Sequence, residues 1–463
     1  MGVKSDNFSV KVTRSETVAP NQPWHDHWLP FTNLDLLVPP FDVGSFFCYK
    51  RSDDHSVDAT TMVGALKSSL SQALTLFYPL AGEIVRNAVG EPEIYCNNRG
   101  VDFVEAVADV KLQELNFYNP DVSIEGKLMP KREHGVLAIQ VTMLKCGGMV
   151  IATIFDHRVA DGYSANMFVS TWADITRSQP PSFVPSFRRS VLNARRPTVY
   201  TPTTASMFLP LSNLPSLHTD PKRGSNPDQD LLISRIYYIE GEQLKRLQSL
   251  ASENGYQRSK LEAFTSFLWK VTAMFVEDSG HGEICNMAVA VDGRRRLGEG
   301  EGVEKENLML AHFGNVLSIP FGKIQSKDLK DMPLSSVANE VHKFLKSATS
   351  KDHFLELIDW VEDQRPKPLM SRPFAEDNAV SIMVSSGQRF SIMDKMDFGW
   401  GKLVFGSCYA PMARSDSYVM TMASPIKDGD WVVYMHLPRK HLSYIETHST
   451  HLFKPLTNDY LKL

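Results

Sequence analysis

The sequence predicts a two-domain α+β protein, and three observations point to it. The chain has 463 residues, which at about 150 residues per domain corresponds to about two or three domains. Hydrophobic residues make up 43% and charged residues 22% of it, as in an ordinary globular protein. Strand-like and helix-like segments alternate, stop at a proline-rich stretch, and then begin again. We therefore expect domains at 1–177 and 231–463, joined by a crossover linker at 178–230.

The first half of the chain carries three patterns of regular structure. Leu36–Tyr49 places paired prolines before aromatic residues without helical spacing, which favours an extended strand. In Ser56–Phe77 the apolar residues recur every three or four positions, which predicts an amphipathic helix ended by Pro79. Val136–Phe155 contains two apolar runs around a Gly-Gly turn, so we expect a hairpin there.

The second half shows the same alternation and is expected to form another α+β unit. Its predicted strands are Leu231–Ile239 and Ile284–Val291, and its predicted helices are Ser259–Val276, Leu334–Ala348 and His353–Glu362. The segment Gly298–Asn307 is polar. The C-terminal part is mostly strand-like, with turns at Gly and Pro.

Charge and cysteine content exclude several classes of protein. The formal charge is -4 without a dense basic stripe, so nucleic acid is not an expected partner. The 5 cysteines are spread without a C-x-x-C pair, which favours reduced thiols and a cytoplasmic location. We expect no signal peptide, and no apolar run approaches the roughly 18 residues of a membrane span. Because there is no heptad repeat, we expect a monomer.

One short motif carries chemistry. Residues 157–162 read H-x-x-x-D-G. With 14 histidines, 30 aspartates and 27 glycines in 463 residues, this pattern is expected about 0.05 times by chance. His157 stands between a predicted strand and a helix that is expected to begin near Gly162. From such a position an imidazole can act as a base beside a pocket. The alternative is a core histidine, with Asp161 only capping the helix.

Four further segments accompany this motif along nearly the whole chain. They are Leu66–Gly82, Val291–Leu297, Phe313–Val316 and the pentapeptide Asp397-Phe398-Gly399-Trp400-Gly401. In their order and spacing they resemble the plant BAHD family of acyl-CoA-dependent acyltransferases. The resemblance implies a fold like that of chloramphenicol acetyltransferase. It would have two similar-sized domains, a solvent channel between them, and His157 at the middle of the channel.

The resemblance also implies roles for individual residues. His157 is expected to be the general base, without a covalent enzyme intermediate. Asp161 either orients the imidazole or pairs with an arginine of the second domain, for which we favour Arg294, and a plain helix cap is the alternative. Ser385 is the candidate donor to the oxyanion, or else an ordinary strand serine. Asp397 to Gly401 are expected to form a structural loop.

Substrate contacts are predicted on both sides of the channel. The chain has no Walker A or G-x-G-x-x-G sequence, so side chains must meet the phosphates of coenzyme A. The candidates for that role are Lys260, Arg295 and Arg296. The candidates for contact with the acceptor are Ser45, Phe47, Gly387 and Arg372. In the resembling enzymes that acylate shikimate or quinate, a tyrosine and a tryptophan usually stand where this chain has Phe47 and Gly387. The resemblance therefore implies an acceptor side that is less polar and roomier than in those enzymes, whereas Arg372 could clamp a carboxylate.

The segments Phe155–Phe168 and Val384–Phe390 resemble relatives described as coniferyl alcohol acyltransferases. This resemblance implies acyl transfer from an acyl-CoA to the hydroxyl of a phenylpropanoid-type alcohol resembling coniferyl alcohol. The alternatives are hydroxycinnamoyl transfer to shikimate or quinate and N-acylation of a polyamine. Two different classes are a non-catalytic binding protein of the same fold and a metal hydrolase using His157 and Asp161, which lacks H-E-x-x-H and supporting ligands. The expected partners are small molecules only, with acyl-CoA as co-substrate, no permanently bound cofactor and no metal.

Overall fold

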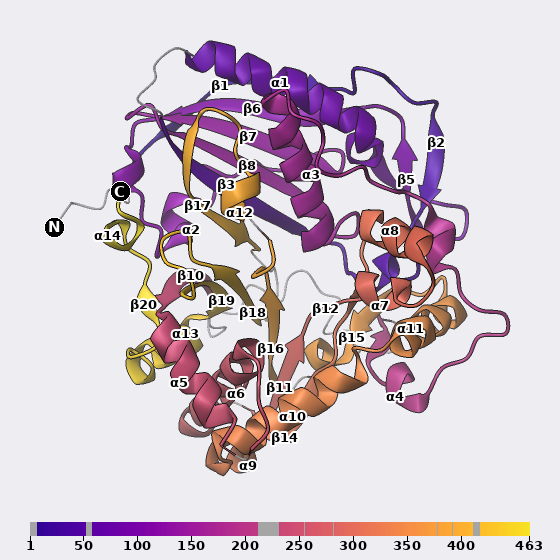
Figure 1. Ribbon diagram of the computed structural model, residues 1–463, viewed down its shortest axis with the longest axis vertical. Coiled ribbons are helices and arrows are strands. Elements are labelled where there is room, and N and C mark those ends of the chain that lie inside the picture. The colour runs from indigo at the N-terminus through magenta and orange to yellow at the C-terminus, as the bar shows by residue number, and fades with distance from the viewer. Residues whose placement is uncertain are drawn as a thin grey trace.

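The computed structural model describes residues 7–51, 58–211, 231–253, 255–280, 282–376, 378–390, 392–410 and 417–463. Residues 212–230 of the predicted linker lie outside the described residues. Two large sheets are stacked, and each is covered by helices on its outer side (Figure 1). This confirms the α+β fold class.

The first sheet has six strands in the order β1-β6-β7-β8-β3-β17, antiparallel except for the parallel pair β6 and β7. In that order the strands span Val10–Val18, Val101–Ala108, Leu137–Leu144, Met149–Asp156, Asp42–Arg51 and Gly401–Tyr409. Helices α1 (Ala59–Leu76) and α3 (Gly162–Thr176) cover its outer face. The predicted first helix and hairpin are therefore present.

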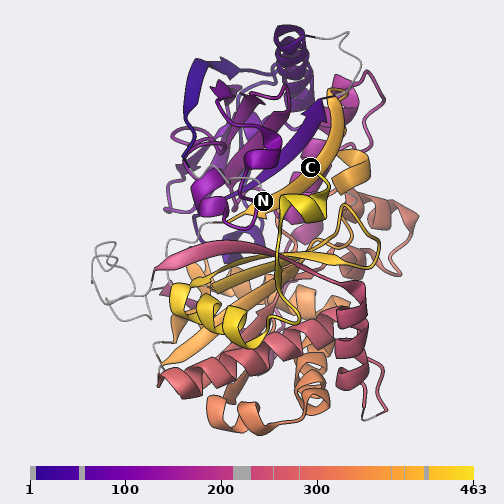
Figure 2. The same ribbon diagram turned by 90° about the vertical axis from the view of Figure 1, so that its left-hand side faces the viewer.

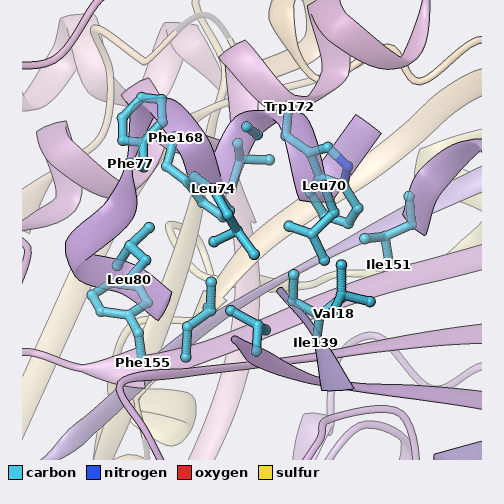
Figure 3. Packing of buried hydrophobic residues seen from close by; sticks show 14 of the residues in the cluster. Val18, Leu70, Leu74, Phe77, Leu80, Ile139, Ile151, Phe155, Phe168 and Trp172 are labelled. Atoms are coloured by element: carbon cyan, nitrogen blue, oxygen red, sulfur yellow. The ribbon is translucent and has the colours of Figure 1, made fainter. Parts of the chain in front are cut away.

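The core between these helices and the sheet follows from the apolar spacing of the sequence. Leu70 and Leu74 of α1 and Trp172 of α3 point down onto Ile139 and Ile151 of the sheet (Figure 3). Each of these side chains is fully buried or nearly so. Burying one such side chain is worth about 1.5–3 kcal/mol, so this face fixes where both helices lie.

The second sheet has seven strands in the order β14-β11-β16-β18-β19-β10-β20. In that order the strands span Phe321–Gln325, Ile284–Val289, Ala379–Ser386, Ser417–Ala423, Trp431–Pro438, Leu232–Ile239 and Lys454–Pro455. The helices around it are α5 (Gly241–Ala251), α6 (Lys260–Ser279), α9 (Ser326–Asp331), α10 (Leu334–Ser347) and α13 (Arg439–His448). The pairs β11–β16 and β16–β18 are parallel, so the ends of β16 and β18 lie at one edge of the sheet.

Smaller elements complete the described part of the fold. The short strands are β2 (His27–Pro30), β4 (Glu83–Arg86), β5 (Pro92–Cys96), β9 (Phe208–Pro210), β12 (Val291–Asp292), β13 (Leu317–Ser318) and β15 (Leu369–Ser371). The remaining helices are α2 (Pro120–Ser123), α4 (Pro202–Ala205), α7 (Arg294–Gly298), α8 (Val303–Ala311), α11 (Lys351–Gln364), α12 (Ile392–Lys395) and α14 (Asn458–Leu461). None of the described helices is both long and apolar enough to cross a bilayer.

One strand does not follow the division of the chain at residue 231. β17 belongs to the second half by sequence, but it pairs with β3 in the first sheet, with Gly406 opposite Phe47. In Figure 2 the orange β17 lies at the edge of the indigo and purple strands, beside β3. Val404 and Phe405 of β17 are buried with residues of both sheets, so burial of these side chains favours the crossing. The stretch 231–463 therefore contributes to both sheets.

Several helices were not predicted, and α5, α8 and α13 are the longest of them. No helical pattern was recognised at α5 or α13, and most of α8 was described only as polar. In α8 the one residue that is fully buried is Met309, so its apolar face is too narrow to give a helical pattern.

Candidate active site

The H-x-x-x-D-G motif forms the turn between β8 and α3, as the sequence predicts. β8 ends at Asp156, and the backbone N–H of Val159 donates to the Asp156 carbonyl at 3.0 Å. α3 begins at Gly162. The His157 N–H donates to the Phe41 carbonyl at 3.0 Å, and the Phe41 ring packs on the imidazole with 5.1 Å between ring centroids. His157 is therefore held between two rigid elements.

Asp161 directs its hydrogen bonds away from His157. As the N-cap of α3 it accepts from the Ser164 N–H at 2.9 Å. Its two carboxylate oxygens accept from Arg294 at 2.7 and 3.1 Å, and Oδ2 also accepts from the Val316 N–H at 3.1 Å. Only 1% of the Asp161 side chain and 0% of the Arg294 side chain is exposed. The predicted ion pair and the alternative helix cap are thus present together.

Arg294 joins the two halves of the chain. It comes from the second half, at the start of α7, and donates to the carbonyls of His312 and Gly314 at 3.1 and 2.8 Å. It also donates to the Ser164 hydroxyl at 2.9 Å, and its guanidinium lies over the Tyr163 ring, 4.5 Å from the centroid. A buried arginine with so many partners fixes the position of both segments.

Burial of the imidazole controls the protonation of His157. Desolvation lowers the pKa of His157 below its ordinary value of 6.5. The backbone of His157, the carboxylates Asp161 and Asp156, and the side chain of Asn315 act in the opposite direction without overcoming burial. At pH 7 the ring is therefore neutral and able to accept a proton.

Ser385 and Gly387 lie at the end of β16, and a nearby loop connects them to the motif. Ser385 is half-buried and lies opposite Met420 of β18 in the second sheet. The Gly387 N–H donates to Thr421, and the Gly387 carbonyl accepts from the Phe390 N–H at 3.0 Å. A Cβ built on Gly162 would lie 3.3 Å from the Phe390 ring. Phe390 therefore brings the end of β16 next to the start of α3.

The other predicted acceptor contacts lie on β3. Phe47 is 3% exposed and belongs to the core of the first sheet, where it packs on Gly406. The Ser45 hydroxyl bonds to the Thr153 hydroxyl at 3.0 Å. Ser45 and Phe47 are two residues apart and so share one face of the strand.

Arg372 is attached to the crossover segment. Its Nε donates to the Ser206 carbonyl at 2.5 Å, and its backbone N–H donates to the Met207 carbonyl at 2.9 Å. The Nε–H of Arg372, which could help to bind a carboxylate, therefore already donates a hydrogen bond within the protein.

The three candidates for phosphate contact lie on two separate helices. Lys260 is the first residue of α6, on the second sheet. Arg295 and Arg296 belong to α7, which packs against α8 and α11. Figure 1 shows α6 and α7 at different sides of the lower half. The three side chains therefore come from two helices that belong to different parts of the second half of the chain.

The pentapeptide Asp397 to Gly401 is a tight, packed turn, as expected. The Asp397 carboxylate accepts from the Gly399 N–H at 2.8 Å, and Gly399 has a φ of 80°, which favours glycine. Phe398 packs on Trp172 of α3 at 4.7 Å between centroids, and the Trp400 Nε1–H donates to a carbonyl of the β7–β8 turn at 3.2 Å. These contacts attach the turn to the first sheet.

Sequence reasoning missed two residues of the site. Phe390 lies three residues after Gly387, and nothing in the local sequence predicts that it reaches α3. Asn315 donates from its side chain to the backbone carbonyls of His157 and Arg158, both at 3.0 Å. The segment Phe313–Val316 had been noted for its resemblance to the family, which was the only signal available for Asn315.

Across the part of the chain that is described, no group of three or more His, Cys, Asp or Glu side chains is arranged to hold a metal ion.

Comparison with known proteins identifies the family. Residues 8–452 match the family model described as "Transferase family". The chain is 28% identical over 450 residues to "Hydroxycinnamoyltransferase" of Narcissus pseudonarcissus, covering 94% of this chain and 97% of that protein. It is 27% identical over 450 residues to "Shikimate O-hydroxycinnamoyltransferase" of Nicotiana tabacum, covering 95% and 99%.

Two solved structures share the fold. Vinorine synthase matches with a TM-score of 0.70 and 20% identity, covering 96% of this chain and 99% of that one. F. graminearum TRI101, complexed with coenzyme A and T-2 mycotoxin, matches with a TM-score of 0.73 and 13% identity, covering 92% and 99%. The family match spans nearly the whole chain, so the chain belongs to the Transferase family of BAHD enzymes and is an acyl-CoA-dependent acyltransferase.

Proposed function

We propose that this acyltransferase esterifies a phenylpropanoid-type alcohol resembling coniferyl alcohol, with His157 as the general base. The observation that carries the mechanism is a desolvated, neutral imidazole beside Asn315 and Asp161, at the junction of the two halves. The imidazole takes the proton of the acceptor hydroxyl while its oxygen attacks the thioester carbonyl. When the tetrahedral intermediate collapses, the C–S bond breaks and the imidazolium returns the proton to the thiolate of coenzyme A.

Ser385 is the proposed donor to the oxyanion of that intermediate. It stands at the end of β16, two residues before Gly387, whose built Cβ would lie 3.2 Å from the Phe390 ring. A donor already oriented by the fold stabilises the developing charge without reorganisation at the moment of reaction.

The acceptor side favours an aromatic alcohol over a polyhydroxy acid. A Cβ built on Gly387 would lie 2.9 Å from the Met420 side chain and 3.2 Å from the Phe390 ring, so apolar groups line the end of β16. Apolar lining with a few polar groups suits an aromatic substrate. Arg372, which a carboxylate would need, donates from Nε to the Ser206 carbonyl.

Hydroxycinnamoyl transfer to shikimate or quinate is the second candidate. The name of the Nicotiana tabacum relative favours it, and it requires Arg372 to turn a guanidinium N–H toward the acceptor. N-acylation of a polyamine is the third. A polycation needs free carboxylates, whereas Asp156 and Asp161 near His157 are paired with Arg158 and Arg294.

The proposal also covers the cellular location, the oligomeric state and the partners of the enzyme. The 5 cysteines carry free thiols, as a protein of a reducing cytoplasm would. We place the enzyme there as a monomer, with the acyl-CoA and the alcohol as its partners in the reaction.

A free-thiol release assay tests the proposal. Acetyl-, benzoyl- and p-coumaroyl-CoA are each combined with coniferyl alcohol, shikimate and spermidine, and His157→Ala is assayed beside the wild type. We expect thiol release that depends on coniferyl alcohol and is lost in His157→Ala. Turnover with shikimate alone would select the second candidate. Release only with spermidine would select the third, and none in any combination would favour a non-catalytic relative.

A further inference from the structure

A polar cavity lies apart from the residues that we assign to the reaction. It has a volume of about 420 Å³ and is lined by residues from 30–33 at the end of β2, from 189–198 of the crossover segment and from the end of α11. None of the residues assigned to the base, the oxyanion, the acceptor or coenzyme A lines it. A cavity of this volume can hold a small metabolite.

Arginine side chains give the wall of this cavity its charge. Arg189, Arg195, Arg196 and Arg365 line it, and Glu362 is the one acidic residue among the described residues of the wall. A hollow lined mainly by one sign of charge raises the local concentration of ions of the opposite sign. The cavity therefore favours an anion.

Buried carboxylates hold two of these arginines from inside the protein. Asp359 accepts from Arg195 Nε at 2.7 Å, and Glu91 accepts from Arg365 Nε and Nη2 at 2.7 and 2.6 Å. The two carboxylate side chains are 1% and 6% exposed, whereas the two arginine side chains are 37% and 33% exposed. Neither carboxylate lines the cavity. Each guanidinium is thus fixed by a buried partner while it remains accessible to a ligand.

The other two arginines are incompletely neutralised by the protein. Arg189 is 10% exposed, its Nη1 donates to the Phe313 carbonyl at 2.9 Å, and the same nitrogen lies 3.7 Å from the carboxylate of Asp35. Its Nε and Nη2 have no hydrogen-bond acceptor among the described residues. Arg196 is exposed, and its side chain has neither an ion pair nor a hydrogen bond with any described residue. An anion in the cavity would supply the missing negative charge.

We propose that this cavity binds a small molecule carrying two phosphate groups, at a site separate from those of the two substrates. A guanidinium binds phosphate through two parallel N–H···O hydrogen bonds, and several arginines around one cavity favour more than one negative charge. Phe31 is the one aromatic residue among the described residues of the wall, and it is 3% exposed. A nucleobase would find no accessible ring for stacking, which disfavours a nucleotide and the adenine end of coenzyme A.

Titration calorimetry with inorganic pyrophosphate tests the proposal on the whole chain. At about 0.15 M salt we expect one saturable site with a Kd below about 1 mM, which saturating coenzyme A does not displace. Absence of saturable binding overturns the proposal. Complete displacement by coenzyme A also overturns it, because the anion would then occupy the substrate site.

Two further probes define the chemistry of the ligand. Fructose bisphosphate carries its two phosphates farther apart than pyrophosphate does, so the tighter of these two probes shows whether the phosphates are joined or separate. Citrate is the comparison, because it carries a similar charge on carboxylates. Tighter binding of citrate than of both phosphate probes would overturn the assignment to phosphate.

Substitution of Arg196 locates the site, since this side chain has no described partner to lose. Loss of one charge-assisted contact in Arg196→Ala should weaken pyrophosphate binding by about tenfold, and the reversed charge of Arg196→Glu should weaken it further. Arg246→Ala is the matched control, because Arg246 is also exposed but lies on α5, outside the cavity. A Kd that is unchanged in Arg196→Glu overturns the proposal.

Acyl transfer separates this cavity from the site of the reaction. In Arg196→Ala, kcat and KM for the acyl-CoA should stay within about twofold of the wild type, because the cavity contains none of the residues assigned to the substrates. A rise in this KM that parallels the loss of pyrophosphate binding would assign Arg196 to coenzyme A and overturn the proposal. A wild type without acyl transfer refutes the proposed function and leaves the binding result valid.

Hydrogen exchange measured by mass spectrometry shows where pyrophosphate binds. We expect slower exchange in peptides that cover 30–33, 189–198 and 362–365, the three parts of the cavity wall, and no change in peptides of α5. Protection that spares all three parts of the wall would place the anion elsewhere and contradict the proposal.

Discussion

His157 and Asp161 stand four residues apart in one motif, yet their surroundings are opposite. Asp161 accepts from the Ser164 and Val316 N–H groups and twice from Arg294. Among the described residues, the Nδ1 atom of His157 has no hydrogen-bond partner. Burial disfavours the charged form of the ring and so lowers the pKa of His157. Within this motif, Asp161 therefore has a structural role and His157 is the residue available for chemistry. The carboxylate joins the two halves of the chain, and the imidazole is left to react.

The largest expected effect is the loss of catalytic rate when His157 is replaced. His157→Ala should lower kcat by about 10²- to 10⁴-fold, because general-base assistance is lost. Its unfolding temperature should stay close to that of the wild type, because no ion pair is removed. His441→Ala is the control, since His441 is fully buried, stacked on Phe275 and remote from the motif. It should lower stability and leave kcat unchanged, as thiol release and thermal unfolding would measure.

The next largest expected effect is on protein stability, when the ion pair between Asp161 and Arg294 is broken. Arg294→Ala leaves the Asp161 carboxylate buried without its cation, which should lower the free energy of unfolding by about 3–5 kcal/mol. Lys245→Ala, which removes an exposed partner of Glu242, should change it by no more than about 1 kcal/mol. Urea unfolding curves measure both. Equal stability of Arg294→Ala and the wild type would contradict the assigned role of the pair.

Ser385 tests whether the second sheet takes part in the chemistry. Ser385→Ala should lower kcat by about 10²- to 10³-fold if the hydroxyl donates to the oxyanion. Ser386→Ala is the matched control, because this neighbour is exposed and points to the other face of β16. If both variants retain full kcat, Ser385 is an ordinary strand serine.

The smallest expected effect concerns Phe390. Phe390→Ala removes the ring that contacts both Gly162 and Gly387, and it should raise KM for the aromatic alcohol by about tenfold. KM for the acyl-CoA should stay unchanged and serves as the internal control. If instead both KM values rise together, the ring supports the whole site rather than the acceptor.

The sequence predicted those elements whose pattern is local. The 3.6-residue spacing of α1 and α3 and the glycine turn between β7 and β8 are visible in a short window. The same holds for the strand, turn and helix around His157. The Asp161–Arg294 pair needed the resemblance to a family as well, because 133 residues separate its partners.

What the sequence missed depends on long-range packing. The place of β17 beside β3 is decided by which apolar faces complete the first sheet. Asn315 is significant only because its amide meets Asp35, 280 residues away, and the His157 carbonyl, 158 residues away. Phe390 likewise acquires a role only when its loop reaches Gly162. No local pattern encodes such contacts.

The pH dependence of kcat/KM tests the central claim most directly. A base must be deprotonated, and burial lowers the pKa of His157 below 6.5. Activity should therefore fall as the pH drops through a value below 6.5 and be at its plateau by pH 7. The residual activity of His157→Ala should lack this limb. A limb that persists in His157→Ala, or a wild type whose activity rises only above pH 8, would contradict the assignment of His157 as the base.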